Sequence, residues 1–115
     1  MSNISLKIDA TKFQKFLRDA PDKMAVAMRN SIYKITLLVE RSAKQNTPVD
    51  TGRLRSSISN NIRPMHAEVR TNTNYAVYVH EGTRYMSARP FMRDAVREVS
   101  QQVNSIVREE LKVLE

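Results

Sequence analysis

The chain has 115 residues, of which 41% are hydrophobic and 27% are charged, and it contains no cysteine. This composition predicts one globular domain over residues 1–115, and it excludes a disulfide scaffold, a thiolate zinc site and a cysteine nucleophile. Nineteen Lys and Arg against twelve Asp and Glu give a net charge of +7, which attracts polyanions but also fits an ordinary basic protein. No apolar run approaches the about 20 residues of a membrane span, so no membrane partner is expected.

The first part of the chain is predicted to form a strand and two helices. Apolar and polar residues alternate from Ile4 to Ile8, as in a strand with one buried face. A short helix with Phe13, Phe16 and Leu17 at helical spacing follows. A long helix is then expected from about Asp22 to Gln45. Its apolar stripe consists of Met24, Met28, Ile32, Ile35, Leu38 and Val39.

The segment from Thr47 to Gly52 is predicted to be a constrained loop. Pro48 biases the preceding residue away from helical backbone angles. The side chain of Asp50 can accept hydrogen bonds from the backbone ahead of it. Gly52 is one of only two glycines in the chain, which suggests a backbone conformation that other residues resist.

An extended β-hairpin is predicted from Leu54 to Arg70. Its second arm, Ala67 to Thr71, alternates small or β-branched residues with charged ones. The segment Pro64-Met65-His66 marks the turn between the arms, and Asn60-Asn61 is the alternative turn position.

The last part of the chain is predicted to be helical. Tyr75 to Val79 has the composition of a strand. However, polar residues 72–74 can cap a helix and Gly82 can stop one, which favours a short helical turn. After a loop from Thr83 to Arg89, Pro90 opens a final helix that runs to about Leu111. Its apolar face consists of Phe91, Ala95, Val96, Val99, Val103, Ile106 and Val107.

This order of elements predicts an α+β fold. A small, mostly antiparallel β-sheet should carry the long central helix and the C-terminal helix packed on it, with an extended β-hairpin. The sequence shows no repeat, linker or low-complexity tract that would divide it.

The sequence contains no strong catalytic or metal-binding motif. His80 and Glu81 begin like the zinc motif His-Glu-x-x-His, but Arg84 stands at the second histidine position. A nucleophile and a base could be drawn from Ser56, Ser57 and His66, yet such sets arise by chance in a serine-rich hairpin. We therefore expect a non-enzymatic protein with no metal, no cofactor and no small-molecule substrate.

The middle of the chain is rich in arginine. Every basic residue from Arg53 to Arg93 is an arginine, and only Glu68 and Glu81 oppose them. The arginines can contact DNA phosphates or an acidic protein surface, or they can be solvated charges that protect an edge strand from aggregation. Neighbouring tyrosines could stack on bases, although core or interface positions are more usual for them.

Three segments together resemble a known family. They are Thr47–Ile58, Tyr75–Thr83 and Ala88–Met92. In this order and at these separations, they are similar to the small tail-component proteins of long-tailed phages and prophages, also called tail-completion or head–tail joining proteins. The resemblance extends from about Ala20 to the C-terminus, and it departs from the family pattern at His80-Glu81.

The resemblance implies a structural virion protein that is assembled in the bacterial host cytoplasm. Such a protein forms a homo-oligomeric ring at the neck, between the head connector and the tail-terminator or tail-tube proteins, with DNA passing through its channel. It needs no cofactor. The charge alone supports an alternative, a basic nucleic-acid-binding protein without sequence specificity.

Partner contacts are expected on the hairpin and the loops. The predicted contact residues are Arg53, Arg55, Arg63, Met65, His66, Arg70, Tyr78, His80, Arg84 and Tyr85. The predicted structural loop positions are Pro48, Asp50, Gly52, Gly82 and Pro90.

Overall fold

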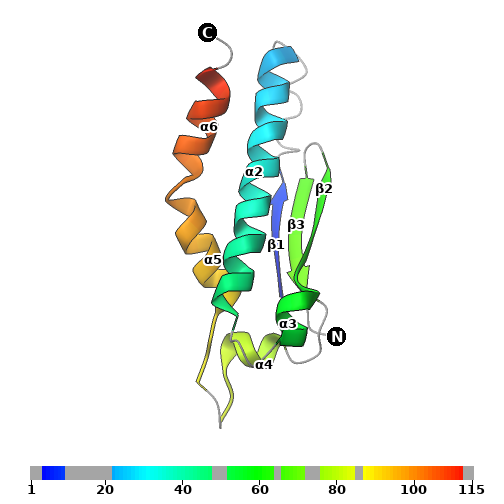
Figure 1. The fold of residues 1–115 in the computed structure, drawn as a ribbon, viewed down its shortest axis with the longest axis vertical. Coiled ribbons are helices and arrows are strands. Elements are labelled where there is room, and N and C mark those ends of the chain that lie inside the picture. Colours follow the sequence, from blue (N-terminus) through cyan, green and yellow to red (C-terminus); the bar gives the residue numbers. More distant parts are fainter. Residues whose placement is uncertain are drawn as a thin grey trace.

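The structure, a computed structural model, describes residues 4–9, 22–47, 52–63, 66–71, 76–84 and 87–112. The described elements are β1 (Ile4–Asp9), α2 (Asp22–Asn46), α3 (Gly52–Ser57), β2 (Ser59–Arg63), β3 (His66–Thr71), α4 (Ala76–Glu81), α5 (Phe91–Ser100) and α6 (Val103–Lys112). The strands form one layer, and α2 lies on one face of it with α5 and α6 alongside (Figure 1). The predicted α+β class, with a long central helix on a small antiparallel sheet, is confirmed.

The sheet has the strand order β1-β3-β2, and both strand pairs are antiparallel. The predicted strand at Ile4–Ile8 is confirmed, and its apolar residues lie opposite those of β3 on the face toward α2. The pairs on this inner face are Ile4 with Thr71, Leu6 with Val69, and Ile8 with Ala67. Alternation along β1 and β3 therefore turns every second side chain toward the core. On the same face of β2, Asn60 remains exposed.

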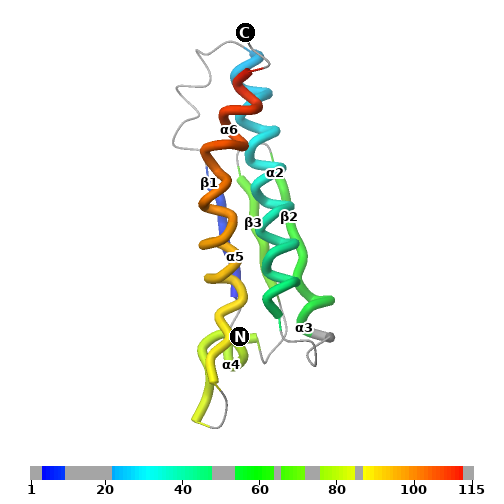
Figure 2. The backbone as a smooth tube through the Cα atoms, turned by 60° about the vertical axis from the view of Figure 1, so that its left-hand side comes forward, coloured from blue at the N-terminus to red at the C-terminus, as the bar shows by residue number. Residues whose placement is uncertain are grey.

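The long helix α2 begins at Asp22, as predicted, and ends one residue beyond the predicted end. Its inner side packs on the sheet and on α5 and α6, which return antiparallel to it (Figure 2). The main core joins residues of α2, α3, β3, α4 and α5 with Ile58, and Ile4 and Leu6 of β1 pack against it. Its buried members are Val39, Ala43, Leu54, Ile58, Val69, Ala76, Val79, Phe91, Met92, Ala95 and Val99. The predicted short helix with Phe13, Phe16 and Leu17 lies outside the described residues.

The predicted start of the hairpin is wrong. Residues from Gly52 to Ser57 form the helix α3, and the first hairpin strand begins only at Ser59. Leu54 and Ile58, which are 0% and 2% exposed, explain the error. A spacing of four places two residues on one face of either a strand or a helix, so their burial pattern fits both.

The rest of the hairpin is as predicted, with its connection at Pro64-Met65. Arg63 pairs with His66, so the turn lies between them, and the two connecting residues are outside the described part. The alternative turn at Asn60-Asn61 is wrong, because both residues pair with β3 inside β2. His66, expected in the turn, is the first residue of β3.

The predicted final helix is divided in two. Gln101 and Gln102 separate α5 from α6, although the backbone stays close to helical and the amide of Gln102 donates to the carbonyl of Val99 at 2.8 Å. Valine, serine and asparagine around the break favour a helix less than alanine or leucine do, and no proline or glycine marks it. The apolar spacing continues through the break, which is why periodicity did not reveal it.

The molecule is elongated. Its principal extents are 53 × 26 × 20 Å, and its Cα radius of gyration is 16.1 Å. A compact chain of this length would have a radius of gyration of about 13 Å. The long axis follows α2, with the C-terminal end of α6 beside the start of α2 and the short helix α4 at the opposite end (Figures 1 and 2).

Candidate interaction surfaces

The outer face of the sheet, which points away from α2, is polar throughout the described strands. Its cross-strand rows are Ser5–Arg70–Ser59, Lys7–Glu68–Asn61 and Asp9–His66–Arg63. The helices α2, α5 and α6 lie on the opposite side (Figure 1). Antiparallel sheets commonly leave one such face to water. Three predicted contact residues, Arg63, His66 and Arg70, therefore share one accessible face, where carboxylates lie among the cations.

Arg55 lies elsewhere, so its predicted place on the hairpin is wrong. It belongs to α3, and its Nη2 donates to the backbone carbonyl of Thr47 at 3.0 Å. Thr47 follows the last residue of α2, and its own hydroxyl donates to the carbonyl of Ala43 at 2.7 Å. A guanidinium on the final carbonyls of a helix compensates groups that have no partner within the helix. Arg55 thus fastens α3 to the end of α2.

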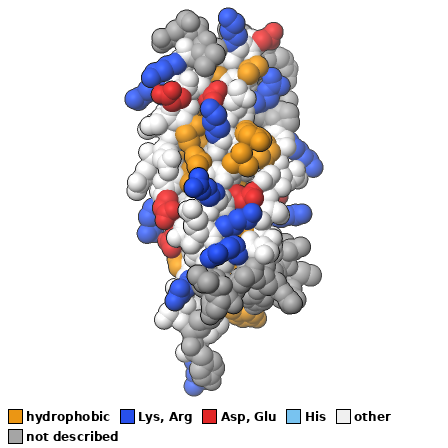
Figure 3. Space-filling view, viewed as in Figure 1, with side chains coloured by type: hydrophobic (Ala, Val, Ile, Leu, Met, Phe, Trp, Pro, Cys, Tyr) orange, Lys and Arg blue, Asp and Glu red, His pale blue; other side chains and the backbone are white. Residues whose placement is uncertain are grey.

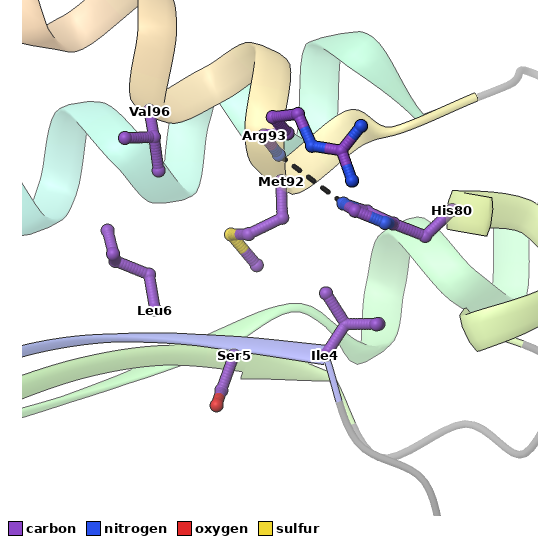
Figure 4. A pocket seen from close by; sticks show the side chains of 7 residues that line it. All are labelled: Ile4, Ser5, Leu6, His80, Met92, Arg93 and Val96. Carbon is purple, nitrogen blue, oxygen red and sulfur yellow. Dashed lines mark hydrogen bonds between the residues drawn. The ribbon is translucent and has the colours of Figure 1, made fainter. Parts of the chain in front are cut away.

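His80 is 6% exposed, so the predicted surface position of this residue is wrong. Its Nδ1 lies 2.9 Å from a carboxylate oxygen of Glu81, and its Nε2 accepts the backbone N–H of Arg93 at 3.4 Å. The rings of His80 and Phe91 form an edge-to-face contact, with their centroids 5.3 Å apart. These contacts join α4 to the first turn of α5 (Figure 4).

Other predicted contact residues lie at the α4 end, away from the outer sheet face. Tyr78 is 58% exposed on α4, and Arg84 is exposed just after it. The predicted helical turn is confirmed, and Gly82 ends it with a φ of 82°, a left-handed conformation that favours glycine. The side chain of Arg53, and the residues Met65 and Tyr85, lie outside the described part of the chain.

The predicted loop positions have different outcomes. Pro90 stands at the N-cap of α5, one residue before the helix begins. Gly52 is the first residue of α3 rather than a loop residue. Pro48 and Asp50 lie outside the described residues.

A cavity of about 310 Å³ lies between β1 and α5. Its lining residues are Ile4, Ser5, Leu6, His80, Met92, Arg93 and Val96. The side chains of Leu6, Met92 and Val96 make much of it apolar, and the hydroxyl of Ser5 points away from it (Figure 4). The lining therefore does not bring a nucleophile and a base together.

A polar contact fastens α6 to α2. The carboxylate of Glu110 forms an ion pair with Lys34 and accepts a hydrogen bond from Asn30 at 3.3 Å. The hydrogen bond from Lys34 is the main cause that lowers the pKa of Glu110 below its usual 4.5, aided by Asn30 and opposed by burial. Glu110 is thus held as a carboxylate against α2.

The helix α2 carries a second apolar stripe that was not predicted from the sequence. Val26, Tyr33 and Leu37 are 42%, 53% and 39% exposed, and they lie on the side opposite the core. Their spacings of seven and four residues place them on one helical face together with Asn30. We call Val26, Asn30, Tyr33 and Leu37 the outer seam of α2. On the face that α2 crosses, Figure 3 shows hydrophobic patches among many Lys and Arg side chains and fewer Asp and Glu side chains.

The described residues show neither a metal-binding cluster nor a membrane-spanning helix. They contain no group of three His, Cys, Asp or Glu side chains placed to hold a metal ion. None of their helices combines the length and the hydrophobicity that crossing a membrane requires.

A family model described as "Bacteriophage HK97-gp10, putative tail-component" matches residues 10–82. This range contains α2, the hairpin and α4. It includes the whole of the segment Thr47–Ile58 and all of Tyr75–Thr83 except Thr83, while the third segment, from Ala88, lies beyond it. Comparison with curated proteins and with solved structures gave no match. Because the family match covers more than half of the sequence, the chain belongs to the HK97-gp10-like family of phage tail components.

Proposed function

We propose that this tail component is a head–tail joining, or tail-completion, adaptor that forms a ring at the neck. The observation that carries the proposal is the family match, reinforced by the three resembling segments in their order along the chain. A tail component acts by binding other virion proteins. In this role the protein contacts copies of itself, the head connector and the tail-terminator or tail-tube proteins, and it performs no catalysis.

The shape of the subunit supports this role. A rod of 53 × 26 × 20 Å built from two layers presents two long opposite surfaces, the outer face of the sheet and the outer side of α2. A ring-forming adaptor needs several separate surfaces, some for neighbouring subunits and others for the structures above and below. The exposed Arg63 and Arg70 can pair with acidic protein surfaces or face the DNA in the channel.

Deletion of the gene in its phage or prophage tests the proposal. The expected result in electron micrographs is filled heads separate from tails, together with a loss of infectious particles. Supplying the gene in trans should restore joined particles, and a frameshifted copy is the matched control. Normal infectious particles from the deletion strain would overturn the proposal.

A basic protein that binds nucleic acid without sequence specificity is the second candidate. The net charge of +7 and the exposed Arg63 and Arg70 favour it. Glu68 and Asp9 lie in the same cross-strand rows, however, so the outer sheet face is not uniformly positive. Duplex DNA binding at low salt, weakening steeply as salt rises, would support this candidate, and replacing both arginines should reduce the slope by up to about 2.

A further inference from the structure

The outer seam of α2 has the residue spacing of a helix–helix contact. Val26, Asn30, Tyr33 and Leu37 are separated by four, three and four residues, the alternation of the d and a positions in a heptad. Within the seam, Tyr33 and Leu37 are 53% and 39% exposed, so a large part of their apolar surface faces water in the isolated subunit. A second helix lying along α2 would cover them.

Between residues 26 and 41, the exposed positions beside this seam are basic, whereas the other flanking positions, Ala27 and Thr36, are buried. Arg29 occupies the g position, and Lys34 and Arg41 occupy the e positions, which decide the choice of partner in a helix pair. Lys34 is already paired with Glu110. Within the described residues, Arg29 and Arg41 are exposed and form no ion pair, so their charges are available to a partner.

The acidic residues of α2, Glu40 and Asp22, do not neutralise the charges of Arg29 and Arg41. Glu40, the next d position, forms an ion pair with Lys44 at 3.1 Å and a hydrogen bond with Asn60. Asp22 lies at the first residue of the helix, where its charge favours the helix dipole. Arg29 and Arg41 therefore remain beside the seam as positive charges that form no ion pair within the described residues.

We propose that the outer seam of α2 binds an amphipathic helix of another virion protein, with apolar residues on its contacting face and Asp or Glu beside them. This inference rests on the proposed structural role in the virion and adds the chemistry of one partner. Apolar side chains would cover Tyr33 and Leu37, and carboxylates would pair with Arg29 and Arg41.

Two other occupants fit the surface less well. A second copy docked seam to seam would bring Arg29 and Arg41 against their own counterparts, and such like-charge contact disfavours association. In a head-to-tail contact, the polar outer sheet face of a second copy would offer no apolar side chains to cover Tyr33 and Leu37. DNA would use the arginines but would gain little from Val26, Tyr33 and Leu37, because phosphate binding needs cations rather than apolar surface.

Photo-crosslinking in assembled particles tests the proposal. Tyr33 is replaced by benzoylphenylalanine in a complemented deletion strain, and the crosslinked peptides are identified by mass spectrometry. A crosslink to a carboxylate-rich amphipathic segment of a different virion protein is expected. Placing the same group at Lys7, which is exposed on the outer face of the sheet, is the matched control and should not give that crosslink.

Charge reversal sharpens the same experiment. Arg29→Glu combined with Arg41→Glu should lower the yield of the crosslink by about tenfold or more, since both flanking attractions become repulsions. Leu37→Ser should lower the yield as well. All three side chains are exposed, so the thermal midpoint of the purified variants should stay close to that of the wild type.

Crosslinks to another copy of the chain or to DNA would overturn the proposal. So would the absence of any crosslink when the subunit is present in the particle, or a crosslink yield that charge reversal leaves unchanged. The neck location is measured separately, by imaging the labelled subunit on the same particles. A subunit found elsewhere in the tail would refute the neck role, and the crosslink would still decide the nature of the partner.

Discussion

The outer face of the sheet and the outer seam of α2 differ in what they leave exposed. On the sheet, alternation along the strands places apolar residues inward and a mixture of Lys, Arg, Asp, Glu, Ser and Asn outward. On α2, apolar residues occupy the inner side and also a narrow stripe on the outer side. Solvated mixed charges need no partner for stability, whereas an exposed apolar stripe with basic flanks gains from being covered.

The comparison shows that the two layers share one core but carry different kinds of outer surface. A contact through the sheet would depend mainly on charge and would weaken with salt. A contact along α2 would depend mainly on apolar burial, with charge selecting the partner. Substitutions on the outer sheet face and on the outer seam of α2 can test these two kinds of contact separately.

The largest expected effect is a difference in the free energy of unfolding between substitutions on the inner and outer sides of α2. Ile32 is 4% exposed and packs beside Ala67, so Ile32→Ala should lower the free energy of unfolding by about 2–5 kcal/mol. Leu37→Ala, one turn away on the outer seam, should change it by no more than about 0.5 kcal/mol. Urea denaturation measures both. Equal losses for the two variants would mean that the outer seam is part of the core.

The next effect concerns the sheet. Glu68 lies directly opposite Lys7 in the neighbouring strand, so Glu68→Lys places two cations side by side. The expected loss of unfolding free energy is about 0.2–1 kcal/mol at low salt, and it should shrink as salt is added. Glu68→Gln, which removes the charge without reversing it, is the control. A loss that does not respond to salt would contradict a solvated, charge-dominated face.

Much of the fold was predictable because strong patterns marked it. The alternation at Ile4–Ile8, the stripe on α2 and the stop at Gly82 each reflect a rule that acts within a few residues of the chain. The start of the hairpin was not predictable, because the spacing of Leu54 and Ile58 suits both helix and strand. The break after α5 carries no proline or glycine, so only tertiary packing reveals it.

The interaction surfaces were harder to predict than the fold. Residue type suggested that Arg55 and His80 would be exposed, but exposure depends on neighbours distant in the sequence, such as Thr47 for Arg55 and Phe91 for His80. The outer seam of α2 had a signal in the sequence, the spacing of Val26, Tyr33 and Leu37. That signal was overlooked because the stronger stripe on the same helix satisfied the expected pattern.

A smaller effect on stability is expected from removing the exposed arginines of the sheet. Arg63→Ala with Arg70→Ala should change the free energy of unfolding by no more than about 0.5 kcal/mol, because both side chains are solvent-exposed. If the outer face contacts an acidic partner, this variant should still lower the yield of joined particles in the complemented deletion strain. Stable protein with an unchanged yield would remove these two residues from the predicted contact set.

The smallest effect is the pH dependence contributed by Glu110, which fastens α6 beside the outer seam. Its pKa is lowered in the folded protein, so the unfolded chain takes up a proton at this group first as the pH falls. The stabilisation is therefore complete above the ordinary pKa of 4.5 and is lost as the pH falls through the folded-state pKa. Glu110→Gln should flatten the change in unfolding free energy between about pH 6 and about pH 3, measured by urea denaturation at each pH. Glu109→Gln is the matched control, because Glu109 is an exposed neighbour that forms an ion pair with Lys112. An equal flattening in both variants would show that the contact with Lys34 and Asn30 does not stabilise the docking of α6 on α2.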